Sequence, residues 1–103
     1  IDDKEYIMFF DMRSIALFQE LSGMPFLRAI HLIDKYDDKA IITFMASSIR
    51  PIDDQENPLG EKLFEFDIIG LLLSYTMDVI ELVGSSMPQG DKNSKKKVQV
   101  KKN

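Results

Sequence analysis

The sequence predicts a mainly α fold: a small four-helix domain over residues 1–88, with a short N-terminal β-strand or strand pair, and a disordered lysine-rich tail over residues 89–103. Three observations lead to this prediction. Apolar residues recur at three- and four-residue spacing in four segments, as in helices that pack on one side. Residues that cap or break helices separate these segments. The last thirteen residues contain six lysines and no aromatic residue, a composition that favours disorder.

The N-terminal region begins with an aromatic run, EYIMFF at residues 5–10, which predicts one strand or an extended edge. Asp11 predicts the start of a helix, because its side chain can accept a hydrogen bond from a free backbone amide of the first turn. Gly23 predicts the end of that helix, since glycine adopts the left-handed conformation of a helix C-terminus without strain.

Two further helices follow. Pro25 suits the first turn of a second helix, which is expected to run to about Lys35. Asp37 or Asp38 is expected to cap a third helix that continues until Pro51. The apolar positions of this third helix are Ile41, Ile42, Phe44, Met45 and Ile49.

A fourth helix, predicted over residues 67–83, is apolar on almost every side. It follows an acidic, proline-bracketed loop at residues 51–60 and the segment 62–66, which could be a helical turn or a brief extended piece. One stripe of the helix consists of Ile68, Leu72, Tyr75, Val79 and Leu82. A second stripe consists of Ile69, Leu73, Met77 and Ile80. An ordinary surface helix has one apolar stripe, so this helix is either central in the domain or shared with another protein.

Charge is divided unevenly along the chain. Residues 1–90 hold seven Lys and Arg against sixteen Asp and Glu, whereas residues 91–103 hold six Lys against one Asp. An acidic body argues against nucleic-acid binding, because attraction to phosphate dominates such affinity. The apolar helix also carries Asp78 and Glu81 within its apolar stretch and is shorter than the ~20 residues that a bilayer core requires, so no membrane span is predicted. The basic tail is interpreted as a solubilising end or as an electrostatic tether to an acidic partner.

No set of residues predicts catalysis, a cofactor or a metal site. The chain has no cysteine, and its single histidine, His31, has Asp34 one turn later, which predicts a boundary histidine bonded to a carboxylate. The acidic clusters at residues 34–38 and 53–56 lack the spacing of a calcium-binding loop. Neither a GxSxG motif nor a glycine-rich phosphate loop is present. We therefore predict a protein that is not an enzyme.

The order of three segments resembles the tail assembly chaperones of long-tailed bacteriophages and prophages. These segments are YIMFFDMRSIALFQELSG, DDKAIITFMASSIRP and FDIIGLLLSYTMDVIELVGSSMP, which together cover most of residues 5–88. The resemblance implies a mainly helical homo-oligomer without a cofactor that binds the tape-measure protein and recruits the major tail protein during viral morphogenesis. It also implies a location in the host bacterial cytoplasm and absence from the mature virion.

The second stripe of the fourth helix is the candidate partner-binding surface. Its residues are Ile69, Leu73, Met77 and Ile80. A competing candidate is the first strand, through Tyr6, Met8 and Phe10, because an exposed edge strand pairs with other chains.

Two alternative functions remain open at this point. One is a small helical adaptor in another assembly, which the sequence does not distinguish from a chaperone. The other is a nucleic-acid-binding regulator that uses the basic tail. For that regulator, the third helix offers only Ser47, Ser48 and Arg50 to contact base edges.

Overall fold

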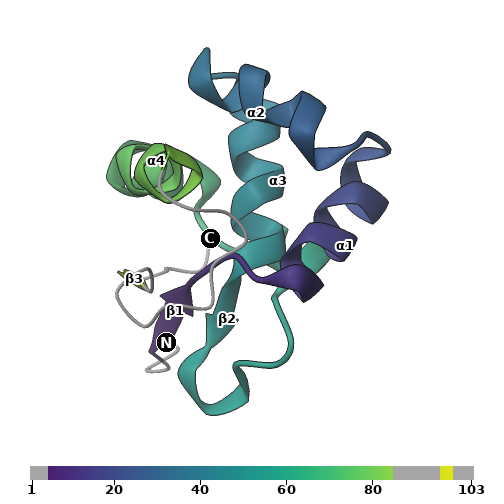
Figure 1. The fold of residues 1–103 in the computed structure, drawn as a ribbon. Helices are drawn as coiled ribbons and strands as arrows, with labels where there is room; N and C mark the ends of the chain where they lie inside the picture. Colours follow the sequence, from purple (N-terminus) through teal and green to yellow (C-terminus); the bar gives the residue numbers. More distant parts are fainter. Residues whose placement is uncertain (1–4, 85–95, 99–103) are drawn as a thin grey trace.

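Four α-helices and a small antiparallel sheet make up the part of the chain that the computed structural model describes, residues 5–84 and 96–98 (Figure 1). The elements, in chain order, are β1 (Tyr6–Met8), α1 (Met12–Ser22), α2 (Phe26–Asp34), α3 (Asp38–Ser48), β2 (Ile49–Pro51), the 3₁₀ helices η1 (Ile52–Asp54) and η2 (Gly60–Glu65), α4 (Ile68–Gly84) and β3 (Lys96–Val98). The predicted mainly helical fold with a short N-terminal strand pair is confirmed.

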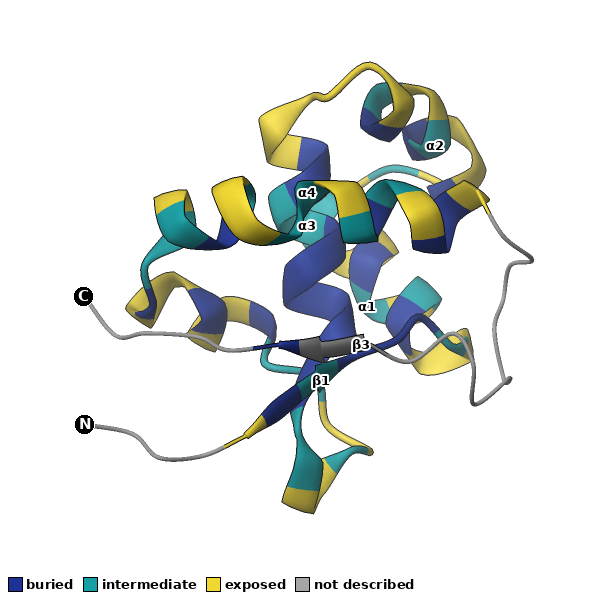
Figure 2. Ribbon diagram, turned by 90° about the vertical axis from the view of Figure 1, so that its left-hand side faces the viewer, coloured by how far each residue is buried: buried dark blue, intermediate teal, exposed yellow. Residues whose placement is uncertain are grey.

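The central helix of the domain is α3. Most of its residues are buried, and it packs against α1, α2, α4 and η2. Figures 1 and 2 show α1 and α4 on opposite sides of α3, with α2 across one end of it. Small residues such as Ala40 and Ala46 let the neighbouring elements approach α3 closely. The central position that the sequence left open for the fourth helix therefore belongs to α3, and α4 lies at the periphery.

Phenylalanine rings from three helices and the β1–α1 connection form the centre of the core. The Phe10 ring stacks on Phe44 at a centroid distance of 4.4 Å and on Phe26 at 4.6 Å. Phe18 meets Phe26 edge to face at 5.2 Å. Such pairs add about 0.5–1.5 kcal/mol each beyond the burial of apolar area. Residues that are adjacent in the core thus come from α1, α2, α3 and the segment after β1.

The predicted helix caps are confirmed. Asp11 accepts a hydrogen bond from the Ser14 amide at 3.0 Å, and the Asp37 side chain caps α3 in the same way. Gly23 ends α1 with a φ of +73°, the left-handed conformation that favours glycine. These caps fix where α1 and α3 begin and where α1 ends.

The third helix is shorter than predicted. Helix α3 ends at Ser48, and the next three residues form β2. The hydroxyls of Ser47 and Ser48 donate to the Phe44 carbonyl at 2.9 and 2.6 Å and so satisfy a carbonyl in the last turn. Pro51 disfavours a helical conformation at Arg50, which instead pairs with β1. The segment 62–66, which the sequence left undecided, lies mostly in the 3₁₀ helix η2.

The sheet has the strand order β2–β1–β3, with both pairs antiparallel. The predicted disorder of residues 89–103 is therefore wrong for residues 96–98, which form β3. Val98 lies opposite Tyr6 and is buried in the core. A three-residue strand within a lysine-rich segment carries no periodic pattern, and its hydrogen-bonding partner is supplied by β1. The rest of the predicted tail lies outside the described residues.

Candidate functional site

One side of α4 faces the core and the opposite side faces solvent. Ile69, Leu73 and Met77 are 71%, 83% and 64% exposed. Residues spaced by four lie on the same side of a helix, so these three form one row, here called the outer row. Figure 2 shows α4 in front of α3, with exposed residues recurring along its length. The outer row contains three of the seven large apolar residues that are exposed in the described part of the chain.

The two predicted stripes of this helix have different surroundings. Val79 and Leu82 of the first stripe are buried, and its other members pack against the core as partly buried residues. Three of the four residues of the second stripe form the outer row. The fourth, Ile80, is half-buried at the edge of the core. The structure thus identifies the outward face of the helix, which the sequence could not do.

Tyr36 extends the apolar surface beyond α4. It is exposed, and its hydroxyl lies 4.0 Å from the Met77 sulfur, to which it donates a weak hydrogen bond. Tyr36 follows α2 with a φ of +61°, and the amides of Tyr36 and Asp37 donate to the carbonyls of Ile33 and Leu32. This is a Schellman motif with tyrosine at the position where glycine is usual, so the backbone of Tyr36 is strained. The motif holds the aromatic ring of Tyr36 beside Met77.

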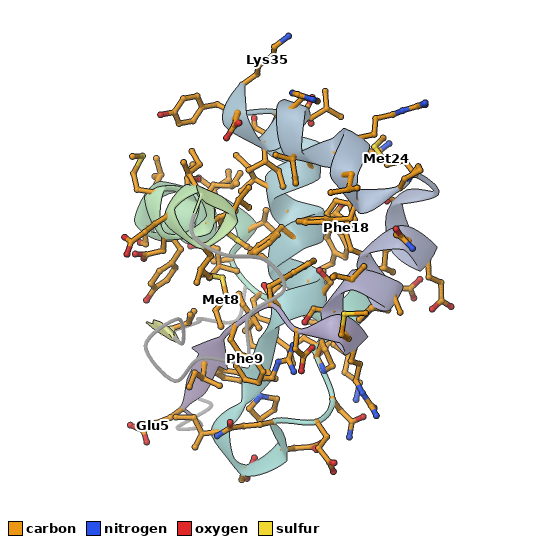
Figure 3. All side chains as sticks on the ribbon, viewed as in Figure 1. Glu5, Met8, Phe9, Phe18, Met24 and Lys35 are labelled. Atoms are coloured by element: carbon orange, nitrogen blue, oxygen red, sulfur yellow. The ribbon has the colours of Figure 1, made fainter. Side chains whose placement is uncertain are left out.

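The competing candidate in the first strand is wrong. Tyr6, Met8 and Phe10 are all buried, and β1 has a hydrogen-bonded strand on each side. Figure 3 shows Met8 directed into the interior, whereas Lys35 projects into solvent from the end of α2. Because β1 is the central strand of the sheet, it offers no open edge to another chain.

A concave surface lies between α1, α3 and η2. This pocket has a volume of about 570 Å³. Its apolar lining comes from Leu21, Ile42, Ala46 and Phe64, and its polar lining from Asp38, Lys39, Thr43 and Glu61. The mixed charges at its rim give no preference for one class of ligand. No sequence pattern singled out Tyr36 or Phe64, because each is an isolated aromatic residue outside the predicted apolar stripes.

Arg50 is the one fully buried charged residue in the described part of the chain. Its guanidinium donates to the carbonyls of Phe9, Ser48 and Gln55 at 3.1, 3.1 and 2.9 Å. It also donates to the Ser14 hydroxyl and to the Asp11 carboxylate, and lies over the Phe9 ring at 3.9 Å. These contacts join β2 to the start of α1 and to the loop after η1, so the role of Arg50 is structural.

The same contacts shift two pKa values. Burial lowers the pKa of Arg50, although the Asp11 charge acts to raise it. Partial burial acts to raise the pKa of Asp11, but the Ser14 amide and the Arg50 charge together hold that pKa below its usual value. The two groups therefore form an ion pair at neutral pH, with 3.5 Å between Arg50 Nη1 and Asp11 Oδ2.

The predicted base-reading residues of the third helix are not available to a ligand. Ser47, Ser48 and Arg50 are all completely buried. His31 is exposed and makes no hydrogen bond with Asp34 in the described structure, so the predicted pairing does not form. Among residues 5–84 and 96–98, no cluster of three or more metal-ligating side chains occurs. The described helices include none with the length and apolar character needed to cross a membrane.

Comparisons with protein-family models, with curated proteins and with solved structures found no match to this chain.

Proposed function

We propose that this chain is a non-enzymatic tail assembly chaperone of a long-tailed phage or prophage, which coats the tape-measure protein and recruits tail-tube subunits. The observation that carries this proposal is the exposed outer row of α4, Ile69, Leu73 and Met77, with Tyr36 beside it. Exposed apolar residues that adjoin one another mark a protein-binding surface far more strongly than isolated ones. The family and its partners come from the sequence resemblance described above.

The outer row suits a helical partner segment. Its side chains form a ridge along α4, and such ridges fit between the side-chain rows of another helix. A tape-measure protein exposes apolar helical faces before the tail tube encloses it, and many copies of a small domain could cover those faces. The acidic body, with a net charge of −9 over residues 1–90, would keep such a coat soluble.

The size of the surface favours reversible binding. Full burial of one large apolar side chain contributes about 1.5–3 kcal/mol, and association opposes this with losses of translational and side-chain freedom. Three outer-row residues therefore support modest affinity for each copy, and Met77 can adapt to partner surfaces of different shape. A chaperone that must leave when tube subunits polymerise needs this weak contact, repeated over many copies.

A capture experiment with the long tape-measure protein encoded near this gene tests the proposal. Co-expressed tape-measure segments should co-purify with the wild-type chain, and Leu73→Asp should abolish co-purification without unfolding the domain. Leu27→Asp is the matched control, because Leu27 is 78% exposed on α2, outside the outer row. Equal capture by wild type and Leu73→Asp would reject the outer row as the binding surface. Absence of a tape-measure gene near this one would favour the adaptor alternative.

A further inference from the structure

We infer that Tyr36 is an anchor residue of the partner-binding surface, and that its strained backbone holds the ring in place before the partner binds. An anchor residue is one whose truncation weakens binding by about tenfold or more. The inference rests on the proposed function, with a helical tape-measure segment on the outer row, and adds a residue from outside α4. Among residues 5–84 and 96–98, Tyr36 is the one non-glycine residue with a positive φ.

The fold by itself does not require tyrosine at position 36. A Cβ atom makes the left-handed conformation unfavourable, whereas glycine adopts it without strain. The hydrogen bonds of the Schellman motif come from the backbone amides of Tyr36 and Asp37, so glycine would keep both. The Tyr36 side chain is 56% exposed and lies outside the hydrophobic core. Strain that persists at a side chain unused by the core indicates a role at the surface.

The Tyr36 ring lies at one end of the outer row. Its hydroxyl is 4.0 Å from the Met77 sulfur, whereas Ile69 is eight residues before Met77, about 12 Å along the helix. A segment that docks along the outer row therefore meets Tyr36 beside Met77 and away from Ile69.

Tyrosine in this turn is suited to binding. It offers a large apolar ring at a small cost in side-chain entropy, and it is enriched among the residues that dominate binding energy. Two hydrogen bonds already fix the turn that carries the ring, so its backbone loses little freedom when a partner binds. The strain of the left-handed conformation is thus present before binding and does not weaken the complex further.

Two truncations of Tyr36 separate the ring from the strain. Tyr36→Ala removes the ring but keeps a Cβ atom, whereas Tyr36→Gly removes both. Each variant should bind the purified tape-measure segment about tenfold more weakly than wild type, measured by fluorescence anisotropy. Tyr36→Gly should nevertheless unfold about 4 °C above Tyr36→Ala, because glycine relieves the strain. Tyr36→Phe keeps the ring and should bind within about twofold of wild type.

Phe64→Ala is the matched control for loss of an exposed aromatic ring. Phe64 is 59% exposed and lines the pocket between α1, α3 and η2, outside the outer row. This variant should bind the tape-measure segment as tightly as wild type. A loss as large as that of Tyr36→Ala would show that binding does not depend on the position of Tyr36, and would overturn the inference.

A double-mutant cycle tests where Tyr36 meets the segment. Tyr36→Ala combined with Met77→Ala should lose about threefold less affinity than the product of the two single losses, because the two side chains are in contact. The losses of Tyr36→Ala and Ile69→Ala should multiply, because Ile69 is about 12 Å along the helix from Met77. Equal coupling to both residues, or to neither, would contradict the inferred placement.

The outcomes separate this inference from the proposed function. If Leu73→Asp abolishes binding but both truncations of Tyr36 bind like wild type, the outer row binds the segment and the anchor role is rejected. If Tyr36→Gly is no more stable than Tyr36→Ala, the role of strain is rejected. If wild type binds no tape-measure segment, or forms dimers that Leu73→Asp dissociates, the proposed occupant is wrong and both proposals fail.

Discussion

Arg50 connects parts of the chain that are distant in sequence. Its guanidinium contacts the end of α3, the connection between β1 and α1, and the loop after η1. A buried arginine is tolerated only where its donors find acceptors, and here backbone carbonyls and the Asp11 carboxylate supply them. The positive charge thereby fixes the position of β2 relative to α1.

Arg50→Met tests this structural role. Methionine keeps an unbranched side chain but removes every donor, so the carbonyls of Phe9 and Ser48 lose hydrogen bonds in the interior. We expect the free energy of unfolding to fall by about 3 kcal/mol, measured by urea denaturation. The exposed residue Arg28 provides the control, and Arg28→Met should change stability by no more than about 0.5 kcal/mol. A similar small effect for Arg50→Met would show that the buried contacts are energetically neutral.

The lowered pKa of Asp11 makes part of the stability pH-dependent. The Asp11 carboxyl has an ordinary pKa of 3.8 and a lower pKa in the folded protein. Its charge therefore stabilises the fold fully above about pH 3.8, and this contribution is lost as the pH falls through the folded pKa. Asp11→Asn keeps an oxygen that caps α1 but removes the charge.

Urea unfolding of wild type and Asp11→Asn between about pH 2 and 7 measures this effect. Wild type should be the more stable protein near neutral pH, and the difference should shrink below about pH 3.8. A difference that stays constant on acidification would show that the Asp11 charge does not contribute through the contact with Arg50.

Helix α4 packs one side against the core and leaves the opposite side exposed, where we propose that a partner binds. Val79 is completely buried against the core, whereas Leu73, less than two turns away on the other side, is 83% exposed. The two residues are similar in character, so the sequence does not distinguish their roles. The position of α3 decides which side of α4 is covered.

Asp substitutions at these two positions should have opposite consequences. Val79→Asp places an unpaired charge in the core and should destabilise the domain by several kcal/mol, which would lower the midpoint of thermal unfolding or prevent folding. Leu73→Asp should leave thermal unfolding nearly unchanged and affect only binding. Substantial unfolding of Leu73→Asp would mean that the outer row belongs to the core.

The whole domain depends on a sheet whose three strands come from the beginning, the middle and the end of the chain. β1 lies between β2 and β3, and Val98 of β3 joins the same core as Tyr6 and Met8. The C-terminal strand therefore closes the sheet over one side of the core. This arrangement gives the lysine-rich end of the chain a structural role in residues 96–98.

Substitutions at Val98 test that role. Val98→Ala should lower the free energy of unfolding by about 1–2 kcal/mol through lost apolar burial, and Val98→Asp should lower it further, because a charge would enter the core. Helical content by circular dichroism should stay close to wild type wherever the variants remain folded. Wild-type stability in both variants would show that β3 does not pack against the core.

The sequence alone determined the helical fold class and the helix boundaries that caps set, namely the starts of α1 and α3 and the end of α1. Asp11, Gly23 and Asp37 act through contacts within a few residues, so cap chemistry was sufficient to predict Asp11 and Gly23 and to narrow the third cap to Asp37 or Asp38. The apolar character of α4 was equally evident, and three of its four predicted contact residues are exposed.

The tertiary structure decided which apolar residues are available to a partner. Strands of three residues have no periodic signal of their own, and β1 and β3 are about ninety residues apart in the chain, so local patterns could not pair them. Their pairing buries Tyr6 and Met8 and leaves the outer row of α4 as the exposed candidate. Burial is a property of where elements meet in space, and only the packing of α4 against α3 determines which side of an all-round apolar helix faces solvent.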